Sequence, residues 1–323
     1  MKIILVTGSG GLIGSESVHF FCSLGFTVIG IDNNMRQVFF GEDGSTDWNQ
    51  KRLLESYGER YIHHNVDIRD LKKITKIIDG KDIVFHLAAI VGVEETQLSP
   101  WEVLDVEVGG TMNIINAAAH AKVKKLIFGS SSEVYGDSEA AMHEDSKLAP
   151  RSTYAAAKLI GEEYCKAAQH EFGLNFTILR YFNIYGPRQD QRFVISRFIE
   201  KIIADEIITI YGDGKQTRDF TYIDDAITMT MLAATSDISN CQILNIGTEK
   251  STSINDLLNT ITSVMNKKNS IIKNFVEYDN IRSKEIEVFN RTASIAKCKT
   301  LLNYEPLISL ETGINNLIKY YQP

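Results

Sequence analysis

Tyr154 and Lys158 are the residues whose types and spacing most directly suggest catalysis. They lie four positions apart in the run 152–158 (STYAAAK), which is typical of the start of a helix, so both side chains would share one helical face. A phenol with a pKa of about 10 is a poor base at neutral pH, but a neighbouring ammonium group stabilises the phenolate. The pair therefore predicts a general base for a hydroxyl proton, although the same spacing also occurs by chance on surface helices.

A second candidate group lies upstream, in the run 130–136 (SSSEVYG) that follows a strand-like segment. At the carboxyl end of a parallel strand, the hydroxyls of Ser131 and Ser132 could take part in the proton chemistry of Tyr154. Glu133 could remove an acidified proton beside a ketone. The alternative is a serine-rich loop with a solvated glutamate.

Three glycines, Gly8, Gly11 and Gly14, follow the first apolar segment as G-x-x-G-x-x-G and lead into a helical stretch. A Cβ atom here would block a pyrophosphate from the helix N-terminus, where the amides of Gly11, Leu12 and Ile13 can donate to phosphate oxygens. The spacing therefore predicts a dinucleotide-binding turn, although a tight turn can also require glycines for packing alone.

Asp32 ends the second apolar segment and is followed by Asn33, and both are predicted to contact the cofactor. A carboxylate suits the two ribose hydroxyls of adenosine and repels a 2′-phosphate, which favours NAD over NADP; the alternative is an acid that caps the next turn. We expect His86 to be a core histidine. Further positions expected to contact the same cofactor are Asp67, Ile68, Leu87, Ala88 and Ala89.

Apolar runs of strand length alternate with helical stretches through the first half of the chain. The predicted strands are 2–7, 27–31, 61–66, 82–87 and 125–129, with the first helix near 12–24. This alternation predicts an α/β fold with a Rossmann-type doubly wound parallel sheet. Segment 33–57 is longer than an ordinary connection and is predicted to be a loop, either a functional lid or a solvated insertion at a sheet edge.

The pattern changes after residue 177, which predicts a smaller, interleaved C-terminal α/β lobe that binds the substrate. We expect strands at 177–181, 207–211 and 242–246, a helix at 194–204, and two helical patterns around a strand near 275–278. The expected division is an NAD-binding domain of 1–180 with about 220–247, and a substrate-binding lobe of about 181–219 with 248–323.

The composition is that of an ordinary folded protein. The 323 residues carry 34 Lys+Arg and 41 Asp+Glu, a formal charge of −7, with 44% hydrophobic and 23% charged residues. Net acidity argues against a nucleic-acid partner, and no apolar run reaches the roughly 18–20 residues of a membrane span. The four separated cysteines show no C-x-x-C spacing, so we expect a cytoplasmic protein without a metal site.

Together these segments resemble the extended short-chain dehydrogenase/reductase family, in its nucleotide-sugar epimerase and dehydratase branch. The motifs that carry the resemblance are TGSGGLIGS (7–15), SSSEVYG (130–136), YAAAK (154–158), RYFNIYGPRQ (180–189), IYGDGKQTRDFTYIDD (210–225) and LLNYEP (301–306). The resemblance implies a tightly held NAD that oxidises a sugar, usually at C4, and is restored within one cycle. The implied substrate is a sugar nucleoside diphosphate, which makes 181–219 with 248–323 the expected nucleotide-sugar-binding lobe.

The resemblance also implies roles for individual residues. Tyr154 corresponds to the catalytic base, Lys158 to its partner and ligand of the nicotinamide ribose, and Ser131 to the hydroxyl near O4 of the sugar. Tyr181 corresponds to a residue that contacts the cofactor. The implied substrate-binding residues are Asn183, Arg218 and Arg291, whose guanidinium groups suit a diphosphate. The alternative for each arginine is a surface ion pair.

The fate of the 4-keto sugar stays open between elimination of water, loss of CO2 and epimerisation. The run Ser132-Glu133 resembles the 4,6-dehydratases and uronate decarboxylases, which favours a lyase, but it lacks an Asp to protonate a leaving hydroxyl. A 4-epimerase is the alternative, and segment 32–49 is closer to the CDP-sugar 2-epimerases. Glu107 stands where the family carries Asn before its V-x-G-T stretch. A non-catalytic NAD-binding protein is the remaining hypothesis.

Self-association is a further implication of the resemblance. Members of the family commonly dimerise through two helices, which here correspond to about 100–120 and 153–170. We therefore expect a homodimer with a nucleoside-diphosphate sugar as its small-molecule partner and no membrane partner.

Overall fold

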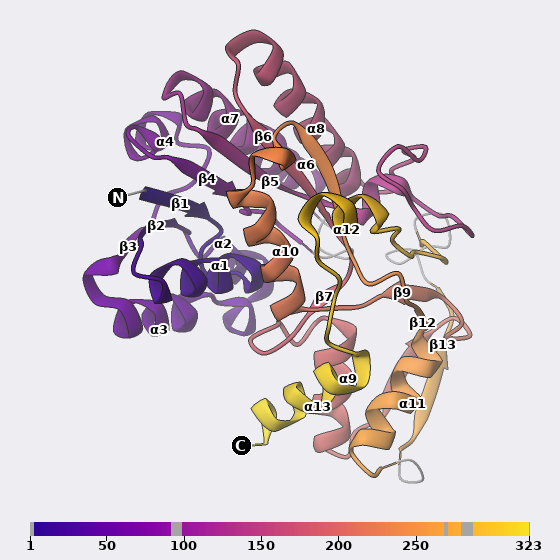
Figure 1. Cartoon of the computed structure of the whole chain (residues 1–323). Helices are drawn as coiled ribbons and strands as arrows, with labels where there is room; N and C mark the ends of the chain where they lie inside the picture. The colour runs from indigo at the N-terminus through magenta and orange to yellow at the C-terminus, as the bar shows by residue number, and fades with distance from the viewer. Residues whose placement is uncertain (1–2, 92–98, 268–270, 279–286, 323) are drawn as a thin grey trace. The chain divides into compact units, whose positions relative to one another are not determined.

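The computed structural model describes residues 3–91, 99–267, 271–278 and 287–322 (Figure 1). The chain divides into two compact units. The first comprises Met1–Val134, Ser152–Arg180 and Thr230–Leu244, and the second comprises Tyr135–Arg151, Tyr181–Met229 and Asn245–Pro323. Residues 135–151, 220–229 and 245–247, which the sequence analysis assigned to the first domain, group with the second unit.

A seven-stranded sheet in the order β11-β6-β5-β4-β1-β2-β3 forms the centre of the first unit. Strand β1 pairs in parallel with β2 and β4, and the pairs β2–β3 and β4–β5 are also parallel. The chain order reverses between β1 and β4, the switch point at which such sheets bind ligands. The predicted Rossmann-type α/β fold is confirmed. The strands are β1 Ile3–Thr7, β2 Thr27–Ile31, β3 Tyr61–His64, β4 Ile83–His86, β5 Lys125–Ser131, β6 Phe176–Tyr181 and β11 Gln242–Ile246.

The central strands are mostly apolar, because they are covered on both faces. Leu5 and Val6 of β1, Phe85 of β4 and Ile127 of β5 are fully buried. Edge strand β3 instead exposes Ile62. This is the burial expected when helices cover both faces of a parallel sheet, and it explains why continuous apolar runs predicted the strands well.

The helices of the first unit place the candidate catalytic residues. Ser152 caps helix α8 (Thr153–Phe172) by accepting a hydrogen bond from the Ala155 amide, and Gly173, with φ of 70°, ends it. Tyr154 is therefore fixed in the first turn and Lys158 in the second. The other helices of this unit are α1 Leu12–Ser23, α2 Met35–Phe40, α3 Asp47–Tyr57, α4 Leu71–Ile78, α6 Pro100–Leu104, the π-helical turn η3 Asp105–Gly110 and α7 Thr111–His120.

Segment 33–57 is helical rather than a loop, so that prediction was wrong. It forms α2 and α3, and α3 buries Asn49, Gln50 and Leu53 while Trp48 is half exposed. The buried face of α3 is mostly polar and is held by hydrogen bonds. Hydrophobic periodicity therefore could not predict this helix.

The second unit is built from helices and short strand pairs. β8 (Ile208–Tyr211) pairs in parallel with β13 (Lys273–Val276), β9 (Thr217–Asp219) pairs antiparallel with β12 (Ser251–Ser253), and β7 (Ile184–Tyr185) pairs in parallel with β10 (Thr221–Tyr222). Among the residues described after position 252 there are three helices where two were predicted, because α12 is too short to show a period. The helices are α9 Val194–Ile203, α10 Ile223–Thr235, which continues into the first unit, α11 Ile254–Val264, α12 Ala296–Leu302 and α13 Leu310–Tyr321.

None of the helices in the described part of the chain is both long and apolar enough to cross a membrane.

Candidate active site

The glycine turn after β1 packs tightly against the chain that leaves β4. Gly8 has φ of +69°, and a Cβ atom there would lie 2.7 Å from the Ala88 amide nitrogen. A Cβ atom on Gly14 would overlap the carbonyl oxygen of Gly8. Gly8 and Gly14 therefore allow the turn to form.

Gly11 is less crowded than these two glycines. It is the residue before α1, no side chain caps the helix there, and a Cβ atom would meet only the Gly8 carbonyl oxygen, at 3.3 Å. The half-buried Leu12 and Ile13 form the first turn of α1. An uncapped helix N-terminus beside a glycine is a good site for an anion, so these residues fit the pyrophosphate of NAD.

Asp32 anchors the glycine turn from the end of β2. Its Oδ2 accepts the Gly10 N–H at 2.9 Å, and its Oδ1 accepts the Asn34 N–H at 2.9 Å. The second contact is the turn-capping role that the sequence left open as an alternative. Asp32 is half-buried, so its carboxylate is oriented beside the turn and partly accessible.

Helix α3 supports the same turn with buried polar side chains that the sequence analysis missed. Asn49 Nδ2 donates to the Gly10 carbonyl oxygen at 2.9 Å, and Gln50 Nε2 donates to Ser9 Oγ at 3.2 Å. The Tyr61 hydroxyl donates to Gln50 Oε1 at 2.5 Å and lies 2.9 Å from Ser9 Oγ, whose hydroxyl can donate to it. All of these side chains are buried, so a buried hydrogen-bonded cluster supports the turn.

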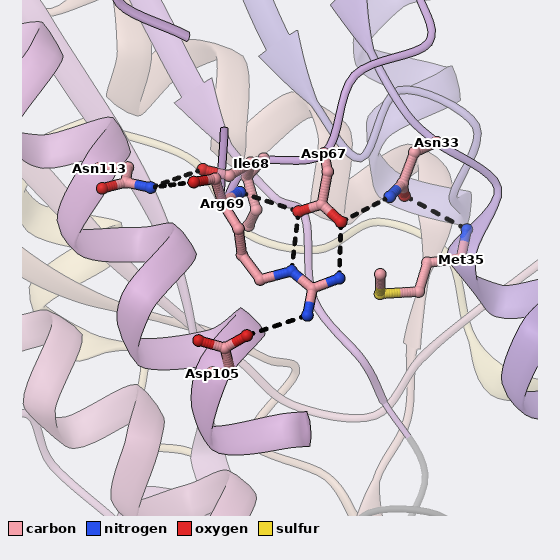
Figure 2. A network of polar contacts seen from close by, with 7 residues as sticks. All are labelled: Asn33, Met35, Asp67, Ile68, Arg69, Asp105 and Asn113. Atoms are coloured by element: carbon pink, nitrogen blue, oxygen red, sulfur yellow. Dashed lines mark hydrogen bonds and ion pairs between the residues drawn. The ribbon is translucent and has the colours of Figure 1, made fainter. Parts of the chain in front are cut away.

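Asp67 lies in a polar network at the ends of the next strands (Figure 2). Arg69 donates to both of its oxygens, from Nε at 3.0 Å and Nη2 at 2.7 Å, and Asn33 Nδ2 donates to it at 3.2 Å. Burial alone would raise the pKa of Asp67, but the hydrogen bonds and charge of Arg69 outweigh it and hold the pKa below its ordinary value. Arg69 also reaches Asp105 at 2.9 Å, and Asn113 donates to two carbonyl oxygens of the same loop.

The remaining predicted cofactor contacts of this unit lie around the ends of the strands. Ile68 is buried against Gly110, and Leu87, Ala88 and Ala89 are half-buried. Thr7 Oγ1 accepts the amides of Leu87 and Ala88, each at 3.2 Å, which fixes this backbone beside the glycine turn.

His86 is a core histidine, as predicted. Its Nδ1 lies 2.8 Å from Thr7 Oγ1 and its Nε2 lies 2.9 Å from Thr111 Oγ1, with the side chain fully buried. Burial, followed by the nearby Lys158 cation, lowers the pKa of His86 to about 3. The imidazole is therefore neutral at physiological pH.

Tyr154 and Lys158 share one face of α8. Lys158 Nζ lies 5.5 Å from the centroid of the Tyr154 ring and 5.5 Å from that of Phe128. Lys158 is buried, whereas Tyr154 is half-buried. The arrangement brings an ammonium charge close to the phenol, as general-base chemistry at this residue requires.

Glu107 also belongs to this site, and the sequence analysis gave it no role. It lies on the π-helical turn η3, and its Oε2 is 2.9 Å from Lys158 Nζ. Its Oε1 accepts the Ile90 N–H at 2.5 Å. The available signal was the replacement of the family's Asn, which places a carboxylate where a neutral amide is expected.

Glu133 lies beside the helix that carries Tyr154. The cap residue Ser152 donates from Oγ to Glu133 Oε2 at 3.3 Å, and the Glu133 amide donates to Ser131 Oγ at 3.2 Å. Ser132 is buried and Glu133 is half-buried. The structure thus brings Glu133 of the run 131–133 to the N-terminal end of α8, with Ser131 hydrogen-bonded to its amide.

The predicted substrate-binding residues belong to the second unit. Arg218 is largely buried; its Nη1 donates to the Val288 carbonyl oxygen at 2.7 Å and its Nη2 to Glu287 Oε1 at 2.5 Å. Arg291 is buried, and Tyr181 is half-buried at the end of β6. The Arg218 contacts are buried, which differs from the surface ion pair considered as the alternative.

Asn183 carries a polar atom suited to a ligand. Within the described residues its Oδ1 is buried and makes no hydrogen bond. Because a buried polar atom without a partner is costly, a bound hydroxyl or amide donor would satisfy it.

The residues described by the structure contain no group of three or more His, Cys, Asp or Glu side chains placed to hold a metal ion.

Comparison with known proteins identifies the family. Residues 4–247 match the model of the NAD dependent epimerase/dehydratase family. The chain is 34% identical to a UDP-glucuronate 4-epimerase of Thermodesulfobacterium geofontis, over 99% of this chain and 96% of that protein. It is also 34% identical to a UDP-N-acetyl-alpha-D-glucosaminuronate decarboxylase of Bacillus cytotoxicus, over 99% and 98% of the two chains.

A solved structure matches the whole chain as well. The crystal structure of UDP-glucuronic acid 4-epimerase from Bacillus cereus, in complex with UDP-glucuronic acid and NAD, superposes with a TM-score of 0.89 at 33% identity, covering 99% of both chains. With its glycine turn, its Tyr154–Lys158 pair and these matches, the chain belongs to the NAD dependent epimerase/dehydratase family.

Proposed function

We propose that this protein oxidises a UDP-linked uronic acid at C4 and then releases its C6 carboxylate as CO2. Two relatives at 34% identity are named for UDP-uronates, which supports the substrate class. The observation that carries the choice of reaction is Glu133, whose carboxylate is hydrogen-bonded to the N-cap Ser152 of the helix that presents Tyr154. In this proposal the first unit binds NAD and the second binds the nucleotide sugar.

Tyr154 is the base of the first step. NAD, when bound, supplies the hydride acceptor for C4 and returns the hydride at the end of the cycle. Tyr154 takes the proton of the 4-hydroxyl group, and the Lys158 ammonium stabilises the phenolate during proton transfer. Ser131 orients the hydroxyl group that is oxidised.

Glu133 completes the second step. A ketone at C4 makes the C6 carboxylate a β-keto acid, so the C5–C6 bond breaks, CO2 leaves, and its electron pair forms the enolate of the ketone. Glu133 passes a proton taken up from solvent to C5. After reduction at C4, Tyr154 returns its proton to O4, so the net change is one proton taken up and one CO2 lost.

A 4-epimerase is the second candidate, because a matching structure at 33% identity is a UDP-glucuronic acid 4-epimerase. In that reaction the 4-keto sugar rotates within the site and is reduced on its other face, so Glu133 has no acid–base role. A 4,6-dehydratase is disfavoured because it needs an acid for the leaving hydroxyl, and the buried Ser132 stands at that position.

The test is mass spectrometry of the purified protein incubated with UDP-glucuronate, UDP-N-acetylglucosaminuronate and, as a neutral control, UDP-glucose. We expect loss of CO2 from a uronate, a loss of about 10²-fold or more in this rate in Glu133→Gln, and loss of all turnover in Tyr154→Phe. The exposed Glu139, changed to Gln, is the matched control and should keep the wild-type rate.

The product decides between the candidates. A new isomer of unchanged mass, formed equally well by Glu133→Gln, would replace the decarboxylase by the epimerase. Full activity of Tyr154→Phe in cells would instead favour a non-catalytic NAD-binding protein.

We also propose a homodimer formed through α6 and α8. These helices pack against each other and expose four large apolar side chains, Trp101, Leu104, Ile160 and Tyr164, with Trp101 81% exposed. A second copy would cover this surface. Light scattering should show a dimer that Trp101→Glu converts to a monomer, while Leu24→Glu, at an exposed position on another helix end, stays dimeric. A monomeric wild-type protein would contradict the proposal.

The cytoplasm is the proposed location. All four cysteines are free thiols and three of them are buried, the state expected in a reducing compartment.

A further inference from the structure

The Lys158 ammonium shares its buried site with one carboxylate. The side chains of Lys158 and Glu107 are 3% and 0% exposed, and their charged atoms lie 2.9 Å apart. The second oxygen of Glu107 is held by the Ile90 amide, so the carboxylate cannot turn away from the ammonium without losing that hydrogen bond. Burial excludes water from screening this pair.

The other ionisable groups packed around Lys158 do not compete with Glu107. On β4, His86 is neutral because burial lowers its pKa to about 3. One turn further along α8, Glu162 is saturated by two hydrogen bonds from Arg180.

Two further acids lie on the elements beside the N-terminal half of α8. Glu133 accepts from the cap residue Ser152, and Asp105 of η3 pairs with Arg69. Asp105 is 63% exposed at its side chain and is therefore screened by water. Of the charges in the described part of the chain, Glu107 is the one set directly against the Lys158 ammonium.

The charge of Glu107 must then affect Tyr154. Beside a lone ammonium, loss of the phenol proton would produce a neutral pair, which a buried site favours. With Glu107 present the ammonium is already neutralised, so the same proton loss leaves one net negative charge.

We propose that Glu107 is a positioning residue that sets the acidity of Tyr154 through Lys158. The ionised carboxylate fixes the ammonium beside the phenol and offsets its charge, so Tyr154 holds its proton to higher pH than it would beside a lone lysine. The added positive charge of an oxidised nicotinamide would then be what favours the phenolate, which ties the base to cofactor loading. The inference rests on the proposed role of Tyr154 as the base.

The experiment measures the ionisation of Tyr154 in the intact protein as purified. Tyrosine labelled with ¹³C at Cζ is titrated by NMR, and Tyr154→Phe identifies the signal. We expect Glu107→Gln, which keeps the side-chain length and an acceptor for the Ile90 amide, to lower the midpoint by about one pH unit. Glu107→Asp keeps the charge and should keep the wild-type midpoint.

The matched control is Glu163→Gln on the same helix, because Glu163 forms an exposed ion pair with Lys166 and should not affect the midpoint. Should Glu107→Gln fail to fold, Glu107→Asn provides a second neutral variant, and its midpoint should fall in the same direction. The acid limb of the pH–rate profile should move with the NMR midpoint.

A midpoint that is unchanged or raised in the neutral variants would overturn the inference, and a purely structural Glu107 would give that result. The titration needs no substrate, so the two proposals fail separately. A lowered midpoint without turnover of any UDP-uronate would reject the proposed function, and normal turnover with an unchanged midpoint would reject the role of Glu107.

Discussion

Two buried ion pairs lie one helical turn apart on α8, and they differ in how completely their charges are satisfied. Glu162 receives Arg180 Nε at 2.9 Å and Nη2 at 2.6 Å, and the Ser130 hydroxyl at 2.5 Å. Among the described residues, only Glu107 places a hydrogen-bonding or charged atom on the Lys158 ammonium. An ion pair whose carboxylate already accepts several hydrogen bonds can only stabilise the fold, whereas an ammonium group with unused N–H donors can also bind a ligand.

The largest effect that tests this comparison is on stability. Glu162→Gln leaves the Arg180 guanidinium buried without its counter-charge, so we expect a loss of about 3–5 kcal/mol in the free energy of unfolding, measured by urea denaturation. Glu163, the next residue of α8, is exposed, so Glu163→Gln should lower the free energy of unfolding by at most about 0.5 kcal/mol. Equal stability of the two variants would show that the Glu162–Arg180 pair is not structural.

An effect that appears only as the pH falls concerns acid stability beside the other pair. His86 has a pKa of about 3 in the folded protein and about 6.5 when unfolded, so the unfolded chain binds the proton first as the pH falls. The stability contribution is complete above pH 6.5 and is lost toward pH 3, with a slope of at most about 1.4 kcal/mol per pH unit. Because the imidazole of His86 stays neutral, it places no second cation beside Lys158.

Denaturation curves at several pH values check this expectation. His86→Gln should flatten the loss of stability between pH 6.5 and 4, while His120→Gln, at an exposed position, should leave it as in the wild type. Equal slopes in all three proteins would assign the acid sensitivity to carboxylates instead.

The sequence predicts the sheet well because its strands are buried on both faces. Each of β1, β2, β4 and β5 was placed to within two residues at each end, since continuous apolar runs followed by turn residues are a direct signal of parallel strands. The Tyr154–Lys158 pair could be predicted from the sequence equally well, because a spacing of four within a helix fixes both side chains on one face.

The parts that were missed depend on polar contacts. Helix α3 is buried through Asn49 and Gln50, and their burial is stabilised by partners on the glycine turn that no local pattern reveals. Glu107 is a similar case, because only the fold brings η3 to Lys158. The short helix α12 contains too few residues to show a period.

The hydrogen bonds from α3 to the glycine turn couple cofactor retention to local unfolding. Opening of α3 removes one hydrogen-bond partner each from Gly10 and Ser9, while Asp32 and Tyr61 still hold the turn, so part of the stability of the turn is lost with the helix. A dinucleotide that binds only the closed turn stabilises α3 by mass action, without touching it. Amide hydrogen exchange in α3 should therefore slow as NAD binds, which makes this helix a built-in reporter of cofactor occupancy.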